Sequence, residues 1–250
     1  MLVIVTALPW EADRFARRLQ GRRRDDLAQG WVVSGARGAL EYRVVVSGPG
    51  PARVREAAAG LATLDPRPTA VVATGIAGGL LAGLGAGSLV LADQLLASLD
   101  EPPLEPEADL SAWLGRALAH GSIRYRSGAN LSVAAELTTP AQKEEAADRA
   151  IVVQMEDHVW AEAATKAGWP FASLRTVLDP LDRAVPDEVI GWDWRGPRAT
   201  KIVAAVLRHP QLALSLARLG WERARARRSI DRALEAIVVA GEPPERGDSR

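Results

Sequence analysis

Short runs of apolar, mostly β-branched residues recur along this chain, and most are followed by a segment with helical spacing. The first run, residues 2–6, reads Leu-Val-Ile-Val-Thr, which is typical of a strand buried on both faces of a sheet. Strands that alternate with helices form a largely parallel sheet covered by helices on both faces. The pattern predicts a three-layer α/β/α fold around a central twisted, mostly parallel mixed sheet.

The same reading gives the approximate position of each element. Strands are expected over residues 2–6, 31–34, 42–47, 70–73, 88–92, 123–126, 151–153 and 171–177. Helices are expected over residues 10–20, 52–64, 108–119, 140–147, 158–167, 200–207 and 211–239. A main catalytic domain is expected over residues 1–185, a helical C-terminal extension packed on it over 186–240, and a disordered tail over 241–250.

The C-terminal helix has an apolar stripe and many arginines. Leucine, isoleucine and alanine recur at helical spacing from Leu212 to Ile237, and six arginines lie between Arg218 and Arg232. Such a helix can lie on a membrane or hold a lipid substrate. It can also pack its stripe on the core and leave its charged face in water, which we favour because basic helix faces are commonly just solvated.

Composition excludes several classes of function. The 31 basic and 31 acidic residues give a formal net charge of zero, so no overall field attracts the chain to nucleic acid. Without cysteine there is no disulfide or thiolate site, and the three histidines are far apart, so no zinc site is expected. No metal or organic cofactor is implied by the sequence as a whole. No signal peptide or membrane span is recognised, which predicts a cytoplasmic protein, with peripheral membrane contact through the basic helix as the alternative.

A methionine and a glutamate lie where a predicted strand meets a predicted helix. Met155 and Glu156 follow the apolar run at residues 151–153. Open α/β sheets build their sites at such junctions. A thioether can pack against an irregular apolar ligand, and a carboxylate can accept hydrogen bonds from two ribose hydroxyls. The alternative is a gap-filling methionine and a glutamate stabilised at the helix start by the macrodipole.

A glycine-rich stretch directly follows the run at residues 70–73. It consists of Thr74, Gly75, Ile76, Ala77, Gly78 and Gly79. Glycines let the backbone approach a ligand and present its N–H groups. The spacing differs from the G-x-G-x-x-G fingerprint, so a nicotinamide-dependent oxidoreductase is unlikely, whereas a plain glycine-rich turn stays an open alternative.

Two further acidic residues follow predicted strands. Asp179 ends the run at residues 171–177, where a buried carboxyl can serve as a general acid, or cap a turn before Pro180. Glu11 lies just beyond the first strand, where it can activate water, or simply favour the helix start.

Taken in order, these segments resemble the nucleoside phosphorylase and nucleosidase superfamily, which includes the methylthioadenosine/S-adenosylhomocysteine nucleosidases. The matching pieces are Ala7 to Glu11, Ser47-Gly48-Pro49-Gly50, the stretch 74–79, Met155-Glu156, and Arg175 to Asp179. Residues 178–186 and the arginine-rich tail are similar to the hopanoid-associated phosphorylase branch.

The resemblance implies an enzyme, a nucleoside N-ribosyl hydrolase or phosphorylase, without a cofactor and usually a homodimer. It assigns Asp179 to protonating the purine at N7, Glu11 to activating water and Glu156 to binding ribose hydroxyls. Met155 would pack against the sugar, and residues 74–79 would line the sugar and nucleophile pocket. The substrate would be an adenosine-type nucleoside, and the hopanoid branch implies a lipid-linked one, adenosylhopane, cleaved by water or by phosphate as co-substrate.

Two positions depart from the family pattern. Leu178 replaces a serine that usually helps to hold the catalytic aspartate, and Ile76 replaces a serine common in the nucleosidases. These departures leave open a nucleoside-binding protein of the same fold with impaired catalysis. A set of phosphate-binding arginines is not recognisable; Arg14, Arg43 and Arg53 are candidates, each better explained as a surface charge.

Overall fold

The computed structural model describes residues 1–28, 30–97, 101–184 and 212–244. Its strands are β1 (Leu2–Thr6), β2 (Gln20–Asp26), β3 (Trp31–Arg37), β4 (Leu40–Val46), β5 (Ala70–Gly79), β6 (Leu89–Leu96), β7 (Tyr125–Ser132), β8 (Val152–Gln154) and β9 (Phe171–Asp179). Its helices are α1 (Pro9–Arg17), α2 (Pro51–Ala62), α3 (Ala108–His120), α4 (Pro140–Ala147), α5 (Asp157–Ala167) and α7 (Leu212–Ala240). The predicted α/β fold with a helical C-terminal extension is confirmed.

The strands form one mixed sheet in the order β2-β3-β4-β1-β5-β8-β7-β6-β9. Strand β9 also pairs with β5, in parallel, from Val71–Phe171 to Gly78–Asp179. Five strands, β5, β8, β7, β6 and β9, are therefore hydrogen-bonded in a closed ring, while β2 is the outermost strand of the open part. A linear reading of the sequence contains no signal for this closure.

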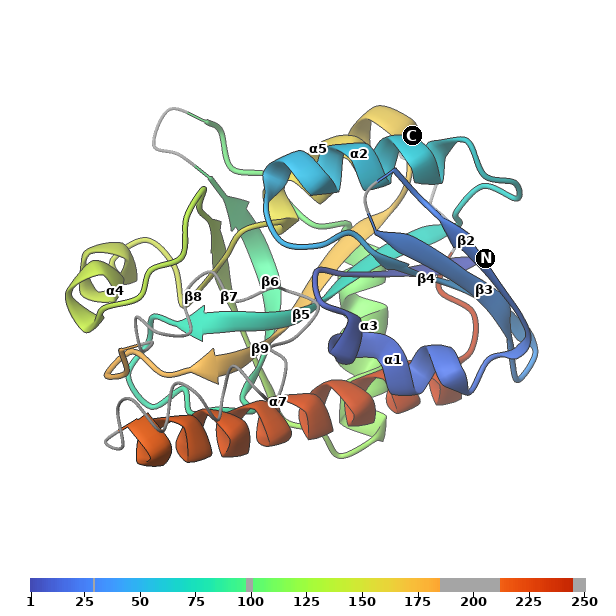
Figure 1. Ribbon diagram of the computed structural model, residues 1–250. Coiled ribbons are helices and arrows are strands. Elements are labelled where there is room, and N and C mark those ends of the chain that lie inside the picture. Colours follow the sequence, from blue (N-terminus) through green and yellow to red (C-terminus); the bar gives the residue numbers. More distant parts are fainter. Residues whose placement is uncertain (29, 98–100, 185–211, 245–250) are drawn as a thin grey trace.

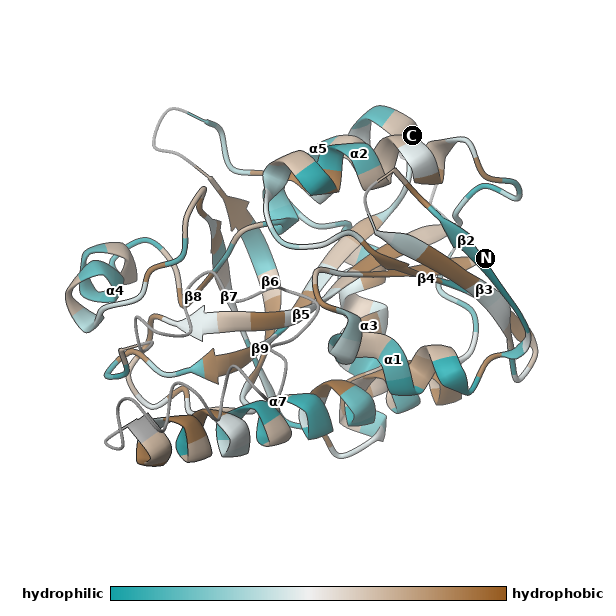
Figure 2. Cartoon of the chain, viewed as in Figure 1, coloured by the Kyte–Doolittle hydropathy of each residue, from teal (hydrophilic) through white to brown (hydrophobic). Residues whose placement is uncertain are grey.

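Helices cover both faces of the sheet (Figure 1). α2 and α5 lie side by side and bury their apolar residues with those of β1, β5 and β9, among them Val54 and Trp160. α1, α3 and α7 pack on the other face, with Phe15 and Leu114 in the shared core. Inner strands such as β4 and β5 carry much hydrophobic surface, whereas the edge strand β2 is hydrophilic (Figure 2), because the inner strands are buried between these two helical layers.

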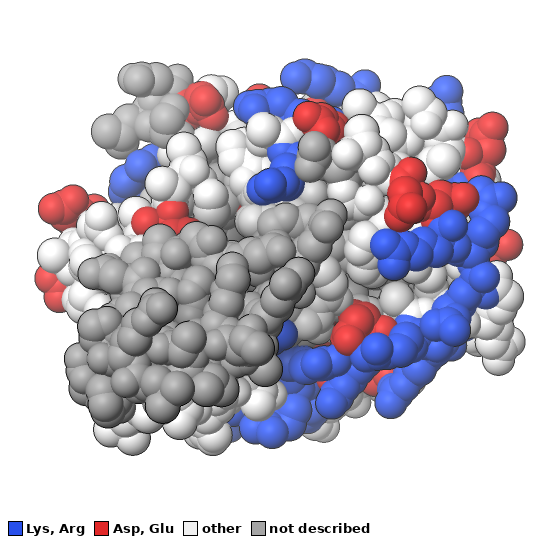
Figure 3. All heavy atoms as spheres, viewed as in Figure 1, with Lys and Arg blue, Asp and Glu red and all other residues white. Residues whose placement is uncertain are grey.

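α7 packs its apolar stripe on the core, as favoured above. Ile230, Leu234 and Ile237 are each at most 1% exposed, and full burial of such a side chain contributes about 1.5–3 kcal/mol. Arg14 pairs with Asp231 at 2.9 Å, and Arg227 pairs with Asp13, so ion pairs also join α7 to α1. Lys and Arg side chains gather over these helices with acidic residues between them (Figure 3).

Some predicted boundaries were wrong. The first helix ends at Arg17 instead of continuing to residue 20, and β2 begins there, a strand of charged residues without apolar alternation. The glycine-rich stretch continues β5 to Gly79 and is not a turn, because Gly78 and Gly79 pair with Val153 and Val152 of β8. The predicted helix at 200–207 and most of the predicted tail lie outside the described residues. No helix in the described part of the chain has the length and apolarity to cross a bilayer.

Candidate active site

Glu11 is held at the start of α1 by two backbone donors from different elements. Its Oε2 accepts from the N–H of Leu8 at 2.7 Å, and its Oε1 accepts from the N–H of Ile76 at 2.8 Å. The helix-start reading of Glu11 is therefore confirmed, since it caps its own helix; it also reaches β5, and its activation of water stays a prediction. Burial raises the pKa of the Glu11 carboxyl to about 7, because the two N–H groups and Arg175 offset the loss of solvent only in part.

Glu156 occupies the N-cap position of α5, immediately after β8. Its Oε1 accepts from the N–H of Gly50 at 3.0 Å, and its Oε2 lies 3.7 Å from Nη2 of Arg175. Burial raises the pKa of the Glu156 carboxyl, and Arg175 opposes the rise. Met155 lies beside it, with its Cε 3.9 Å from the position that a Cβ on Gly50 would occupy.

Arg175 is the buried cation between these acids. It lies in β9 opposite Gly75 of β5 and is 2% exposed. Its Nε donates to Asp157 Oδ2 at 3.0 Å, and Nη2 also pairs with Asp157, which is fully buried and accepts from Asn130 and Ser173. Burial alone would lower the pKa of Arg175, but Asp157 and Glu156 raise it above its usual range.

One nitrogen of Arg175, Nη1, is buried and has no hydrogen-bond partner among the described residues. A Cβ on Gly75 would lie 3.0 Å from this nitrogen and 2.7 Å from Glu11 Oε1. Gly75 has a φ of +140°, which side-chain-bearing residues rarely adopt. Only glycine therefore leaves room between the guanidinium and the carboxylate. An unpaired buried donor is unfavourable, so this small space is suited to an oxygen from a ligand.

Asp179 lies at the end of β9, three residues further along β5 from Gly75. Its Oδ2 is 3.5 Å from a Cβ position on Gly78, and its side chain is 14% exposed. Lys143 of α4 pairs with Oδ2 at 2.5 Å. Burial raises the pKa of the Asp179 carboxyl to about 6, although the Lys143 ammonium opposes the rise.

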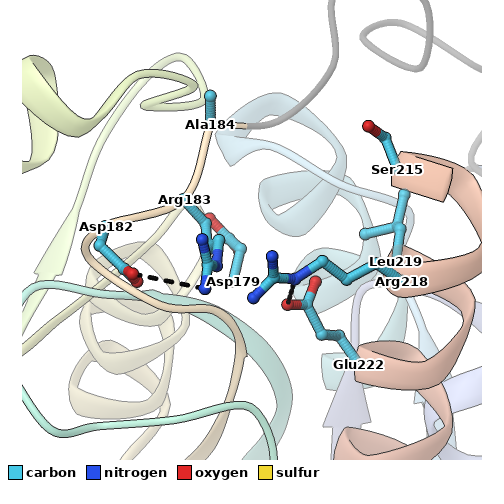
Figure 4. Close-up of a pocket in the computed structure, with 8 residues that line it drawn as sticks. All are labelled: Asp179, Asp182, Arg183, Ala184, Ser215, Arg218, Leu219 and Glu222. Atoms are coloured by element: carbon cyan, nitrogen blue, oxygen red, sulfur yellow. Dashed lines mark hydrogen bonds and ion pairs between the residues drawn. The ribbon is translucent and has the colours of Figure 1, made fainter. Parts of the chain in front are cut away.

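Asp179 borders a cavity of about 240 Å³ formed with α7 (Figure 4). The other residues that line it are Asp182, Arg183, Ala184, Ser215, Arg218, Leu219 and Glu222. In Figure 4 the segment after β9 faces α7 across this space, and Arg218 pairs with Glu222 at 3.2 Å.

The structure thus brings Glu11 and Glu156 together around Arg175. Asp179 lies at the end of β9, opposite Gly78 of β5. Gly78, the β5 residue opposite Asp179, lies three residues and so roughly 10 Å along the strand from Gly75. Asp179 is therefore near the other two acids without touching them. Thr74 is buried in β5, the side chain of Ile76 packs against the core below α1, and Ala77 belongs to a small core cluster with Val90 and Val177. Residues 74–79 therefore approach Glu11 and Arg175 at Gly75 and through the N–H of Ile76, and the predicted lining of a sugar pocket stays a prediction.

The sequence favoured a surface charge at Arg14, Arg43 and Arg53, which is wrong for Arg43. Arg14 is an exposed partner of Asp231. Arg43 is 4% exposed and donates to the carbonyls of Asp65 and Pro66, so it holds a loop and is not a surface charge. Arg53 donates to the carbonyl of Pro49 at 3.2 Å. Arg175 carried a usable signal, a charged residue inside an otherwise buried strand, because such residues are almost never buried unless they are paired.

Within the described ranges no group of three or more His, Asp or Glu side chains is placed to hold a metal ion. The acids at Gly75 are instead bound to backbone N–H groups and to one guanidinium. Such an arrangement can bind hydroxyl groups and move protons.

Comparisons with known proteins identify the family of the chain. Residues 1–209 match the family model described as "Phosphorylase superfamily". A search of the curated proteins finds no match.

Among solved structures, the chain is similar to a 5′-methylthioadenosine/S-adenosylhomocysteine nucleosidase from Neisseria meningitidis in complex with methylthio-immucillin-A. The identity is 15%, the alignment covers 96% of this chain and 99% of that one, and the TM-score is 0.74. The corresponding enzyme from Colwellia psychrerythraea, in complex with adenine, is 18% identical over 96% of this chain and 94% of that one, with a TM-score of 0.72.

A futalosine hydrolase mutant of Helicobacter pylori is 20% identical, over 70% of this chain and 88% of that one, with a TM-score of 0.64. At these identities the structural likeness establishes the fold. The family assignment follows from the match over residues 1–209, which is most of the sequence: the chain belongs to the phosphorylase superfamily.

Proposed function

We propose that this protein hydrolyses the N-glycosidic bond of an adenosine-type nucleoside, with the sugar held beside Arg175 and the base at Asp179. The observation that carries the proposal is the convergence of Glu11 and Glu156 on Arg175, whose unpaired Nη1 lies with Glu11 beside Gly75. A third acid, Asp179, ends the strand β9 that carries Arg175. A nucleoside has the matching polarity, with hydroxyl groups at one end and a basic ring nitrogen at the other.

At the sugar end, Glu156 accepts hydrogen bonds from ribose hydroxyls and its charge stabilises the oxocarbenium-like centre that forms as the bond breaks. Met155 packs against the sugar, which its position over Gly50 allows. Glu11 removes a proton from water. Its raised pKa suits that task, since a general base works best when its pKa lies near the operating pH.

At the base end, Asp179 gives a proton to N7 of the purine, so that the base leaves as a neutral molecule. Its pKa, raised to about 6, keeps part of the population protonated near neutral pH. Of the three candidate site acids, Asp179 is the one that borders the cavity facing α7, where a base has room.

Electrostatics favour water over phosphate as the nucleophile. The space beside Gly75 is flanked by the carboxyl groups of Glu11 and Glu156, and Arg175 is already paired with Asp157. A phosphate dianion would enter beside several acids and one engaged cation, whereas neutral water meets no such repulsion. Phosphorolysis remains the alternative that the assay below distinguishes.

The solved structures support the choice of nucleoside. Two of the similar proteins named above are nucleosidases, one in complex with adenine and one with methylthio-immucillin-A, and the third is a futalosine hydrolase. Within the adenosine class, the resemblance of residues 178–186 to the hopanoid-associated branch makes adenosylhopane our first candidate, giving ribosylhopane and adenine. Methylthioadenosine and S-adenosylhomocysteine are the second.

A lipid-linked substrate would require access from a membrane surface. α7 carries exposed apolar side chains, Leu214 at 81% and Trp221 at 54%, together with the exposed arginines Arg228 and Arg232. Apolar and cationic groups on one helix suit peripheral contact with an anionic bilayer. The cytoplasmic location and the homodimer implied by the resemblance remain predictions.

The test is release of adenine from adenosylhopane or a short-chain analogue, from methylthioadenosine and from adenosine, each with and without phosphate. We expect adenine and a free ribosyl product without phosphate. Turnover that requires phosphate would replace hydrolysis by phosphorolysis. If none of the nucleosides is cleaved but adenine raises the Tm, the chain is a binding protein of this fold, and the proposal is wrong.

The two raised pKa values predict a bell-shaped dependence of kcat/KM on pH. The active form has Glu11 ionised and Asp179 protonated, so activity should fall on both sides of an optimum near 6.5, with limbs near 6 and 7. The limb near 6 reports the ionisation of Asp179 and the limb near 7 that of Glu11, since between them most of the enzyme has Asp179 ionised and Glu11 protonated. Because the acid has the lower pKa, only about a twentieth of the enzyme carries the required protons at the optimum. Initial rates from about pH 5 to about pH 9 measure the profile; a rate that rises steadily across this range would contradict it.

A further inference from the structure

Lys143 is a fully buried lysine whose partners all lie in the segment that carries Asp179. Its Nζ is 2.5 Å from Asp179 Oδ2, and it also lies 3.0 Å from the carbonyl oxygens of Pro180 and Arg183 and 3.4 Å from that of Asp179. Its side chain is 0% exposed. An ammonium group is buried only where charge and hydrogen bonds compensate it, and here one carboxylate and three carbonyls do so.

The rest of α4 contributes little to the core. Apart from Lys143, only Ala146 of this eight-residue helix is buried, and the helix is stabilised locally by Thr139 and Gln142, which cap its start. In Figure 1 α4 lies at the side of the molecule, away from the two helical layers. The main contribution of α4 to the interior is therefore the charged side chain of Lys143.

Lys143 is also the one cation that pairs with Asp179 among the described residues. Of the other charged groups around the cavity, Arg183 pairs with Asp182 at 3.4 Å and Arg218 pairs with Glu222 at 3.2 Å. Glu222 of α7 opposes the ionisation of Asp179, and Lys143 favours it. Residue 178, which precedes the aspartate, is leucine and has no group that can hold the carboxylate.

We propose that Lys143 is a positioning residue that fixes the carboxyl group of Asp179 through Oδ2 and ties it to the backbone of residues 179–183. We call the contact between Lys143 and Asp179 the clamp. This inference rests on the proposed function, because holding Asp179 in one orientation matters for catalysis only if Asp179 protonates the base. Lys143, a side chain of α4, thus supplies the polar contact to Asp179 that Leu178, its neighbour in β9, cannot supply. Lys143 does not touch the substrate and transfers no proton.

The kinetic test compares the wild type with Lys143→Met, which keeps the length and loses the charge. We expect kcat to fall at least tenfold while KM changes less than threefold, because the variant loses the orientation of the Asp179 carboxyl group but keeps the groups that bind the substrate. The limb near pH 6, which reports Asp179 because its pKa is the lower of the two, should move to higher pH, because removal of the ammonium raises the pKa of Asp179. Lys166→Met, at an exposed lysine of α5, should match the wild type. A Lys143→Met profile and kcat equal to the wild type would overturn the proposal.

A second measurement does not depend on turnover. The carboxyl signal of Asp179, identified by its loss in Asp179→Asn, is followed by carbon-13 NMR against pH. It should titrate near 6 in the wild type and clearly higher in Lys143→Met. Equal titration in the two proteins would refute the clamp. If the shift is found but no nucleoside is cleaved by the wild type, the proposed function fails and the clamp stands.

Loss of folding is handled by the double variant Lys143→Met/Asp179→Asn, in which neither charge remains. If the lysine acts on the carboxylate, Lys143→Met should lower the Tm less in the Asp179→Asn background than in the wild type. An equal loss in both backgrounds would mean that Lys143 serves only the backbone carbonyls, and the positioning role would be rejected.

Discussion

Asp179→Asn should lower kcat for a purine nucleoside by about 10²–10⁴-fold, the usual contribution of a general acid. An amide has nearly the shape of the carboxyl group but cannot give up a proton to N7, so the purine would have to leave as an anion. KM should change little, because the amide still forms hydrogen bonds in the same place. Initial rates at the optimum pH measure the effect.

The leaving group provides a sharper control. A 4-nitrophenyl riboside expels a stable anion without protonation, so Asp179→Asn should cleave it at nearly the wild-type rate if the protein accepts it. Asp148→Asn, at an exposed aspartate after α4, is the matched surface variant and should behave as the wild type with both substrates. If Asp179→Asn lost activity equally toward both substrates, Asp179 would not be the acid.

Arg175→Met should lower the free energy of unfolding by about 3–5 kcal/mol, the usual cost of removing one member of a buried ion pair. Methionine fills a similar volume, but Asp157, which is 0% exposed, would keep only Asn130 and Ser173 as partners. Glu156 would lose its nearby cation as well. Urea denaturation of wild type and variant gives the difference directly.

The matched control is Arg116→Met, at an exposed arginine of α3, for which a change within about 0.5 kcal/mol is expected. The double variant Arg175→Met/Asp157→Asn removes the stranded charge and should recover part of the lost stability. A loss below about 1 kcal/mol in Arg175→Met would mean that the buried network contributes little to the fold.

The sequence predicted the interior of this fold well and its periphery poorly. Runs such as residues 2–6 and 171–177 are strands because strong burial on both faces selects β-branched and apolar residues. β2 has no such selection, since six of its seven residues are exposed, and no period was visible in Gln-Gly-Arg-Arg-Arg-Asp-Asp. The pairing of β9 with both β5 and β6 depends on contacts between distant segments, which local patterns do not encode.

The candidate site divides in a similar way. The sequence could nominate Glu11, Glu156 and Asp179 as candidates because each lies just beyond or at the end of a strand in a recognisable motif. Arg175 and Lys143 were not assigned a role in the site, because arginine and lysine usually indicate solvent exposure. Here each is buried in an ion pair, Arg175 with Asp157 and Lys143 with Asp179. The partners in each pair are separated in the sequence, so the pairs are recognised only in the folded chain.

The closed ring of strands has a consequence for behaviour at high concentration. A conventional open sheet exposes two lines of unsatisfied backbone groups, and either can recruit a strand from another molecule. Here, within the described part of the chain, the ring removes one of them, and the remaining border is β2. That border carries Arg22, Arg23, Arg24, Asp25 and Asp26, and charges of this kind discourage strand addition. Resistance to aggregation is therefore concentrated in five consecutive residues, the same ones whose polarity concealed the strand.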